Sequence, residues 1–255
     1  MNKRVRSVYA VLILLLALPA WAGDESVNIG AHKDMKATLV TPEGAGPFPG
    51  VLVLHTSGGL QNGDLKYAER LAEEGYVCLV PEFMAAYGIT GKTRQLTFTK
   101  HAEAISSDLN DGLEYLKKLP NVNKAKLGAV GFSNGGYWAL MLAAQGKVQV
   151  GVSNYGAVTG AGTDRDLKAL DAAFSSKSSP VLILHGDSDS EVPVAAAKKL
   201  GSLLEAKRAP YEIKIYPHTD HRYDRSGKAE DAEAAADSWQ RTLEAFAKYL
   251  KAQPQ

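Results

Sequence analysis

Short runs of consecutive apolar residues alternate along this chain with segments whose apolar residues recur at helical spacing. The first kind is typical of strands buried on both faces, and the second of amphipathic helices. The apolar runs are 50–55, 77–80, 126–131, 148–153, 180–185 and 211–216, and the helical segments are 64–74, 101–118, 135–145, one that follows Pro193 and one that carries Trp239 to Leu250. This alternation predicts an α/β fold with a mostly parallel, doubly wound sheet and helices on both faces.

The composition is that of a globular protein, with 45% hydrophobic and 22% charged residues among 255. Neither an internal repeat nor a low-complexity linker interrupts the chain, so a single domain over residues 23–255 is the simplest organisation. Residues 25–41 are expected to add one or two antiparallel strands at an edge of the sheet.

Two connections, 82–100 and 156–179, are longer than tight loops. Long loops in compact domains tend to be lids or binding loops. The first contains Phe83, Tyr87 and Phe98, which could line an apolar pocket. The alternative is a surface excursion with a short helix.

The first 22 residues have the layout of a secretory signal peptide. Three cations near the start are followed by an apolar run from Val8 to Leu18, and Ala20-Trp21-Ala22 then places small residues where a signal peptidase cleaves. This apolar run is too short to span a bilayer comfortably, which disfavours a permanent membrane anchor. We therefore expect cleavage after Ala22 and export to the periplasm or the cell exterior.

Removal of these residues would take away three cations and no anions, changing the formal net charge from +1 to −2. A nearly neutral chain offers no electrostatic case for binding nucleic acid or an anionic membrane. The single cysteine, Cys78, lies within an apolar run and is interpreted as a small buried hydrophobic residue. Without an internal disulfide, the fold has to be stabilised by its hydrophobic core.

The strongest functional signal is Gly131-Phe132-Ser133-Asn134-Gly135-Gly136, which follows an apolar strand and precedes a helix. It matches the nucleophile elbow, in which a serine lies at a sharp strand-to-helix turn and the residues two positions away on either side have to be small. Ser133 is therefore the candidate nucleophile, and the start of the following helix favours negative charge there. Because the motif also arises by chance, a purely structural turn is the alternative.

A serine hydroxyl needs a base, and in chains with such an elbow the order is Ser, then Asp or Glu, then His. The histidines after Ser133 are His185, inside the end of a strand, and His218 and His221, which follow the last predicted strand. The acid is expected after the preceding strand. Three carboxylates compete for that role: Asp187, Asp189 and Glu191.

From about residue 36 to residue 250 the chain resembles the dienelactone hydrolase family of α/β-hydrolases. In that family the acid lies in a G-x-x-D-x-x-V-P stretch, which residues 186–193 match without a gap and which implies Asp189. The family's base follows a strand ending in Tyr-Pro, which implies His221 within residues 216–221. The resemblance therefore favours these two residues over the neighbouring aspartate and histidine.

The resemblance also implies an oxyanion hole made by two backbone N–H groups. One belongs to Asn134, directly after the nucleophile, and the other to the loop after the first parallel strand, where Ser57 is favoured and Thr56 is the next candidate. Dienelactone hydrolases hold the carboxylate of their substrate with arginines. Arg94 and Arg222 are the candidates for this role here.

The chain departs from the family in two places. Dienelactone hydrolases proper have a cysteine at the elbow, where this chain has Ser133, and a glutamate in the first loop, where this chain has Thr56. A serine needs no control of a resting thiolate, so the two changes agree with each other. They argue against dienelactone itself as substrate and favour a serine esterase on the same scaffold. His55, which closes the preceding strand, is expected to brace the first loop.

These features predict an exported serine hydrolase that cleaves a small-molecule carboxylic ester or lactone through an acyl-enzyme. No cofactor is expected, and His218 and His221, three apart in a loop, are weak evidence for a metal site. One alternative is a serine peptidase or acyltransferase with the same triad. Another is a binding protein that keeps the α/β-hydrolase fold without catalysis.

Overall fold

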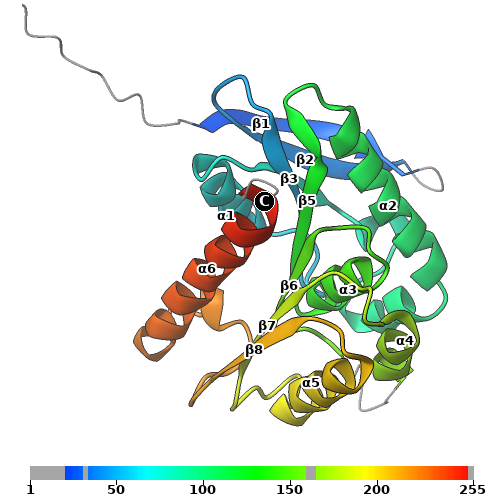
Figure 1. Cartoon of the computed structure of the whole chain (residues 1–255), viewed down its shortest axis with the longest axis vertical. Coiled ribbons are helices and arrows are strands. Elements are labelled where there is room, and N and C mark those ends of the chain that lie inside the picture. Colours follow the sequence, from blue (N-terminus) through cyan, green and yellow to red (C-terminus); the bar gives the residue numbers. More distant parts are fainter. Residues whose placement is uncertain (1–20, 31–33, 159–164, 252–255) are drawn as a thin grey trace, which may run out of the picture.

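The computed structural model describes residues 21–30, 34–158 and 165–251 (Figure 1). Residues 1–20, which form most of the predicted signal peptide, lie outside the described residues. Eight strands form one sheet in the order β1-β2-β4-β3-β5-β6-β7-β8. They are β1 Trp21–Ile29, β2 Met35–Pro42, β3 Phe48–Leu54, β4 Val77–Pro81, β5 Val122–Phe132, β6 Val150–Asn154, β7 Val181–Gly186 and β8 Tyr211–Tyr216.

Helices connect the parallel strands, and the last helix follows the final strand. They are α1 Asn62–Glu73, α2 Ala102–Lys118, α3 Asn134–Ala144, α4 Arg165–Ala173, α5 Val194–Lys207 and α6 Ala232–Phe246, with the 3-10 turns η1 Ala85–Tyr87, η2 Gly91–Phe98, η4 Tyr223–Arg225 and η5 Ala229–Asp231 and a π-helical turn η6 Ala247–Lys251. The predicted α/β architecture is confirmed, and each predicted strand and helix forms within a few residues of its expected limits. The long connections contain η1 and η2 in one case and α4 in the other.

Both faces of the central strands are buried, which explains why these strands are continuously apolar. In β3, Leu52 and Leu54 pack into one core with α2, α3, α4 and α5, whereas Val51 and Val53 pack into a second core with α1 and α6. Figure 1 shows these two groups of helices on opposite sides of the strands. Successive side chains of a strand point to opposite faces, so a strand between two helical layers has to be apolar at every position.

The predicted antiparallel edge is present. β1 pairs with β2 from Trp21↔Pro42 to Ile29↔Met35, and β2 pairs in turn with β4, also antiparallel. β1 thus starts earlier than expected, because the backbone of Trp21 already joins the ladder. Cleavage after Ala22 would leave the pairs from Gly23 onwards in place.

The other strands run parallel, from β4 and β3 through to β8. Their carboxyl ends therefore lie at one edge of the sheet, where open α/β sheets bind their ligands. Cys78 is fully buried within β4, and this burial raises the pKa of its thiol far above the ordinary value. Its interpretation as a core residue is confirmed.

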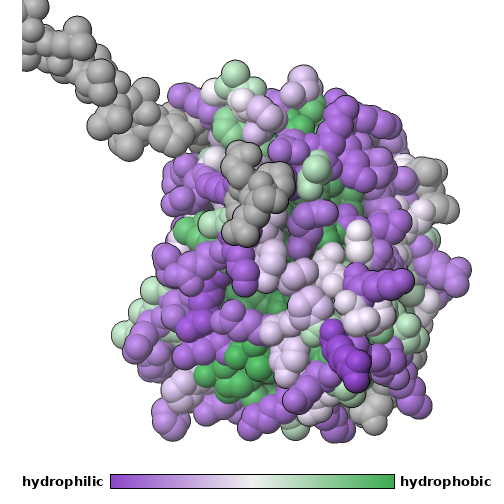
Figure 2. Space-filling model, viewed as in Figure 1, coloured by the Kyte–Doolittle hydropathy of each residue, from purple (hydrophilic) through white to green (hydrophobic). Residues whose placement is uncertain are grey.

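The surface seen in Figure 2 is mostly hydrophilic, with hydrophobic residues exposed in separate patches. Within the described part of the chain, no helix combines the length and the apolar character needed to cross a membrane.

Candidate active site

Ser133 lies at the turn between β5 and α3 in a backbone conformation that side chains rarely adopt, with φ 52° and ψ −110°. Two glycines make this turn possible. A Cβ at Gly131 would lie 2.0 Å from the carbonyl oxygen of Gly135, and a Cβ at Gly135 would lie 2.1 Å from that of Leu54. Any larger residue at either position would collide with backbone. The elbow predicted from the sequence has therefore formed, and such strained residues cluster at functional sites.

Asp189 and His221 form a hydrogen-bonded pair, with Nδ1 of the imidazole 2.7 Å from Oδ2 of the carboxylate. Asp189 comes from the loop after β7 and His221 from the loop after β8, and both side chains are buried. The other carboxylate oxygen accepts the backbone N–H groups of Glu191 and Val192 at 2.9 and 2.7 Å. An ionised carboxylate held in this way keeps the proton of His221 on Nδ1 and leaves Nε2 free to accept one.

A second carboxylate fixes the loop that carries His221. Oδ1 of Asp220 accepts the backbone N–H of His221 at 2.7 Å and the backbone N–H and hydroxyl of Ser190 at 2.9 and 2.8 Å. The pKa of Asp220 is lowered mainly by the hydrogen bonds that it accepts from the backbone N–H groups of Ser190 and His221. The loops after β7 and β8 are thereby tied together as one unit.

The end of β6 links the elbow to the base. The N–H of Ser133 donates to the carbonyl of Asn154 at 3.0 Å, and the ring of the next residue, Tyr155, meets the His221 imidazole edge-on at 4.7 Å between centroids. In the described part of the chain, no hydrogen bond joins the side chains of Ser133 and His221. Nucleophile–base hydrogen bonds in free enzymes are often long and tighten only when substrate binds.

The loop after β3 is fastened to the elbow through His55. The carbonyl of His55 accepts the N–H of Gly135 at 3.1 Å, and its Nδ1 lies 2.7 Å from the carbonyl of Thr56. The imidazole is fully buried and stacks on Phe83, with centroids 4.2 Å apart, and burial lowers its pKa. A neutral, stacked His55 thus braces the loop that carries Ser57, as the sequence suggested.

The rival acid and base do not join this arrangement. The carboxylate of Asp187 accepts the backbone N–H of His218 at 2.7 Å, and both residues are exposed at the surface. His185 is buried, donates Nε2–H toward the carbonyl of Val192 at 2.8 Å and lies 3.3 Å from Asp189 Oδ2. Burial lowers the pKa of His185. His185 therefore contacts the acid and the backbone of the loop after β7 in the protein interior.

The two candidate arginines are placed differently. Nη2 of Arg222 donates to Oε1 of Gln61 at 3.1 Å, at the residue that precedes α1, so it lies beside the first loop. Arg94 is exposed and its Nη1 donates to Gly91 within its own 3-10 turn at 3.0 Å. Of the two, only Arg222 spans from the base loop to the first loop.

The three aromatic residues of the 82–100 connection pack into the protein. Phe83 is buried against His55, Phe98 meets Tyr137 edge-on, and the hydroxyl of Tyr87 donates to Asp108. These contacts fix the segment beside the first loop. The segment contains the short helical turns η1 and η2, and its role as a lid or binding loop stays a prediction.

A buried polar network behind the site is not evident from the sequence. Arg225 forms ion pairs with Asp64 at 2.8 Å and Asp224 at 3.0 Å, and Asp224 accepts the hydroxyl of Tyr155 at 2.5 Å. The network connects the start of α1 to the residues that follow His221. The only sequence signal was the position of Asp224 and Arg225 shortly after the base, which a single sequence cannot distinguish from a surface turn.

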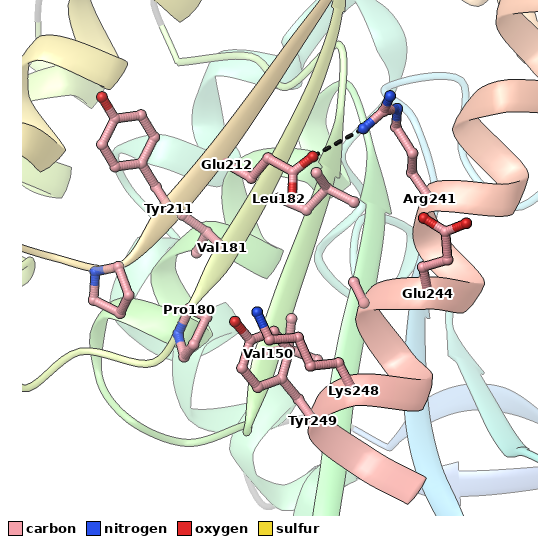
Figure 3. Close-up of a pocket in the computed structure, with 12 residues that line it drawn as sticks. Val150, Pro180, Val181, Leu182, Tyr211, Glu212, Arg241, Glu244, Lys248 and Tyr249 are labelled. Atoms are coloured by element: carbon pink, nitrogen blue, oxygen red, sulfur yellow. Dashed lines mark hydrogen bonds and ion pairs between the residues drawn. The ribbon is translucent and has the colours of Figure 1, made fainter. Parts of the chain in front are cut away.

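A cavity of about 400 Å³ lies elsewhere, at the amino ends of β6, β7 and β8. Figure 3 shows side chains from α6 and η6 facing the beginnings of β7 and β8 across it, with Arg241 paired to Glu212. Because Ser133, Asp189 and His221 lie at the carboxyl ends, this cavity belongs to the opposite edge of the sheet. Among the described residues, no group of three or more His, Cys, Asp or Glu could hold a metal ion.

A mostly parallel sheet with this elbow after β5 and with an acid and a histidine after β7 and β8 defines an α/β-hydrolase fold. The family model described as the dienelactone hydrolase family matches residues 35–250. The chain therefore belongs to the dienelactone hydrolase family and is a hydrolase acting on ester bonds.

Individual relatives are similar over most of their length. A Synechocystis protein named as a carboxymethylenebutenolidase is 28% identical over 244 residues, covering 86% of this chain and 99% of the relative. One from Methylorubrum extorquens is 29% identical, covering 82% and 75%. The crystal structure of a Klebsiella pneumoniae protein assigned as a dienelactone hydrolase superposes with a TM-score of 0.77 at 25% identity, covering 89% and 99%.

Proposed function

We propose that this protein is a serine esterase of the dienelactone hydrolase family that cleaves a small-molecule carboxylic ester or lactone, with Ser133, His221 and Asp189 as catalytic triad. The observation that carries the proposal is the buried hydrogen bond of 2.7 Å between Asp189 and His221, on loops that flank a strained serine elbow. The relatives from Synechocystis and Methylorubrum extorquens are named as carboxymethylenebutenolidases, which supports a lactone or ester as substrate class.

In the proposed cycle, Nε2 of His221 takes the proton of Ser133 while Oγ attacks the acyl carbonyl. The backbone N–H groups of Asn134 and Ser57 stabilise the oxyanion, which is typically the largest single contribution to such catalysis. His221 then returns the proton to the leaving oxygen, and water releases the acyl group by the same steps. Asp189 holds the imidazole tautomer and stabilises the imidazolium.

The test is the intact mass of the protein after treatment with a fluorophosphonate probe. A single adduct is expected on the folded protein and none on the Ser133→Ala variant or on protein unfolded in urea, because only a serine activated by its base reacts. Lack of an adduct on folded protein would contradict an activated Ser133 and favour the non-catalytic alternative. Paired ester and amide substrates then separate an esterase from a peptidase.

We further propose export to the periplasm or the cell exterior, on the basis of the charged start, the apolar run and the Ala20-Trp21-Ala22 site. When the full-length chain is expressed in a bacterium, protein recovered outside the cytoplasm is expected to begin at Gly23. The measurement is the N-terminal sequence and intact mass of that fraction. Recovery of the full-length chain in the cytoplasm alone would refute the proposal.

A further inference from the structure

The charge next to Nε2 of His221 affects which ester the protein prefers. This inference rests on the proposed esterase mechanism. In that mechanism Nε2 of His221 delivers a proton to the leaving oxygen. The alcohol part of the ester therefore lies next to Nε2. Any charged group near this atom acts on the alcohol part more strongly than on the rest of the substrate, since Coulomb interactions weaken with distance.

Glu191 supplies such a charge. Its Oε2 lies 3.9 Å from Nε2 of His221, on the side of the imidazole opposite the hydrogen bond to Asp189. The side chain is 62% exposed, so the carboxylate faces the solvent from which a substrate arrives. Its backbone is held in place, because the N–H of Glu191 donates to Asp189 at 2.9 Å. The backbone that carries this carboxylate is thus held beside the proton-transfer atom by the triad's own acid.

In the described part of the chain, the ion-pair partner of this carboxylate is the imidazole of His221 itself. No lysine or arginine of the described residues forms an ion pair with Glu191. The loops after β7 and β8, residues 187–193 and 217–222, together carry four carboxylates and one arginine. That arginine, Arg222, is hydrogen-bonded to Gln61 on the side of the first loop. The base side of the site is therefore acidic, whereas the first loop, residues 55–61, contains no Asp, Glu, Lys or Arg, and burial lowers the pKa of its histidine, His55.

We propose that Glu191 is a specificity-determining residue that selects esters whose alcohol part carries a positive charge, such as esters of amino alcohols or quaternary ammonium alcohols. A cation two or three bonds from the ester oxygen lies within a few ångströms of this carboxylate. An anionic alcohol part is repelled from the same place. Because the carboxylate is largely solvated, the selectivity is moderate and depends on salt.

The experiment compares three esters with the same acyl group: a choline ester, its uncharged 3,3-dimethylbutyl isostere, and an ester whose alcohol part ends in a carboxylate. For the parent protein we expect kcat/KM to be about three- to tenfold higher for the choline ester than for the isostere, and lowest for the anionic ester. In Glu191→Gln the preference is expected to disappear, and in Glu191→Lys to be reversed. High salt is expected to reduce the preference in the parent.

A matched control is Glu205→Gln, which removes the same charge from an exposed position near the end of α5. Helix α5 begins near the carboxyl ends of the strands and ends near the start of β8, so Glu205 lies away from the active site. We therefore expect this control to keep the preference of the parent protein for the choline ester. An equal preference in Glu191→Gln and Glu205→Gln would overturn the inference, as would a parent that hydrolyses all three esters equally well. A parent that hydrolyses none of them and takes up no phosphonate would overturn the proposed function as well.

Discussion

Replacing His221 with asparagine is expected to lower kcat for ester hydrolysis about 10⁶-fold, because no other group in the site takes the proton of Ser133. Asparagine can still donate a hydrogen bond to Asp189 and fills part of the space, so the fold is retained. The measurement is the steady-state rate with a chromogenic ester, together with the urea midpoint of unfolding to verify that the variant is folded.

The matched control is His218→Asn, the same substitution three residues earlier. His218 is exposed and adopts φ 57°, a conformation that asparagine tolerates well. Its side chain makes no contact with the Asp189–His221 pair, so kcat is expected to stay within about twofold of the parent. Loss of activity in His218→Asn with retention in His221→Asn would assign the base to the other histidine.

Replacing Asp189 with asparagine is expected to lower kcat about 10⁴-fold. The oxygen of the amide can still accept the N–H groups of Glu191 and Val192. The amide nitrogen then faces Nδ1 of His221 and donates to it, which moves the imidazole proton to Nε2. In that tautomer His221 cannot accept the proton of Ser133. The pH–rate profile and kcat of the variant test this expectation.

Asp187→Asn is the control for this substitution. Asp187 is exposed, and its carboxylate accepts the N–H of His218, the N–H of Thr219 and the hydroxyl of Ser188. We expect kcat close to that of the parent and a small loss of stability in the loop. A loss of activity in Asp187→Asn as large as that in Asp189→Asn would show that the buried pair does not carry the catalytic function.

The same four residues mark the point where the amino-acid pattern stops distinguishing one candidate from its neighbour. Residue order and strand ends narrowed the acid to three carboxylates and the base to two histidines within short loops. Family resemblance then favoured Asp189 and His221, and their hydrogen bond of 2.7 Å agrees with that choice. The local sequence pattern alone could not identify which of these residues form the acid–base pair. Residues two or three positions apart in a loop point in directions that are set by the hydrogen bonds of that loop. Asp220 and the backbone of residues 190–192 supply those bonds here.

Features that depend on neighbours along the chain can be predicted from the order of the amino acids. Apolar runs specified buried strands, helical spacing specified the covering helices, and Gly131 and Gly135 specified the elbow at Ser133. Each follows from local sterics or from the periodicity of one element. The order of strands, with β4 between β2 and β3, needed contacts between distant segments and came only from the tertiary structure.

The surroundings of the triad depend on contacts between segments that are distant in the sequence. It placed Tyr155 against the base, paired Arg225 with Asp64 from more than a hundred residues away, and brought Glu191 to within 3.9 Å of Nε2. None of these residues has a local pattern that reveals its partner. Side chains that are distant in the sequence come into contact only because the carboxyl ends of the parallel strands lie at the same end of the sheet. These contacts set the charge and shape of the site.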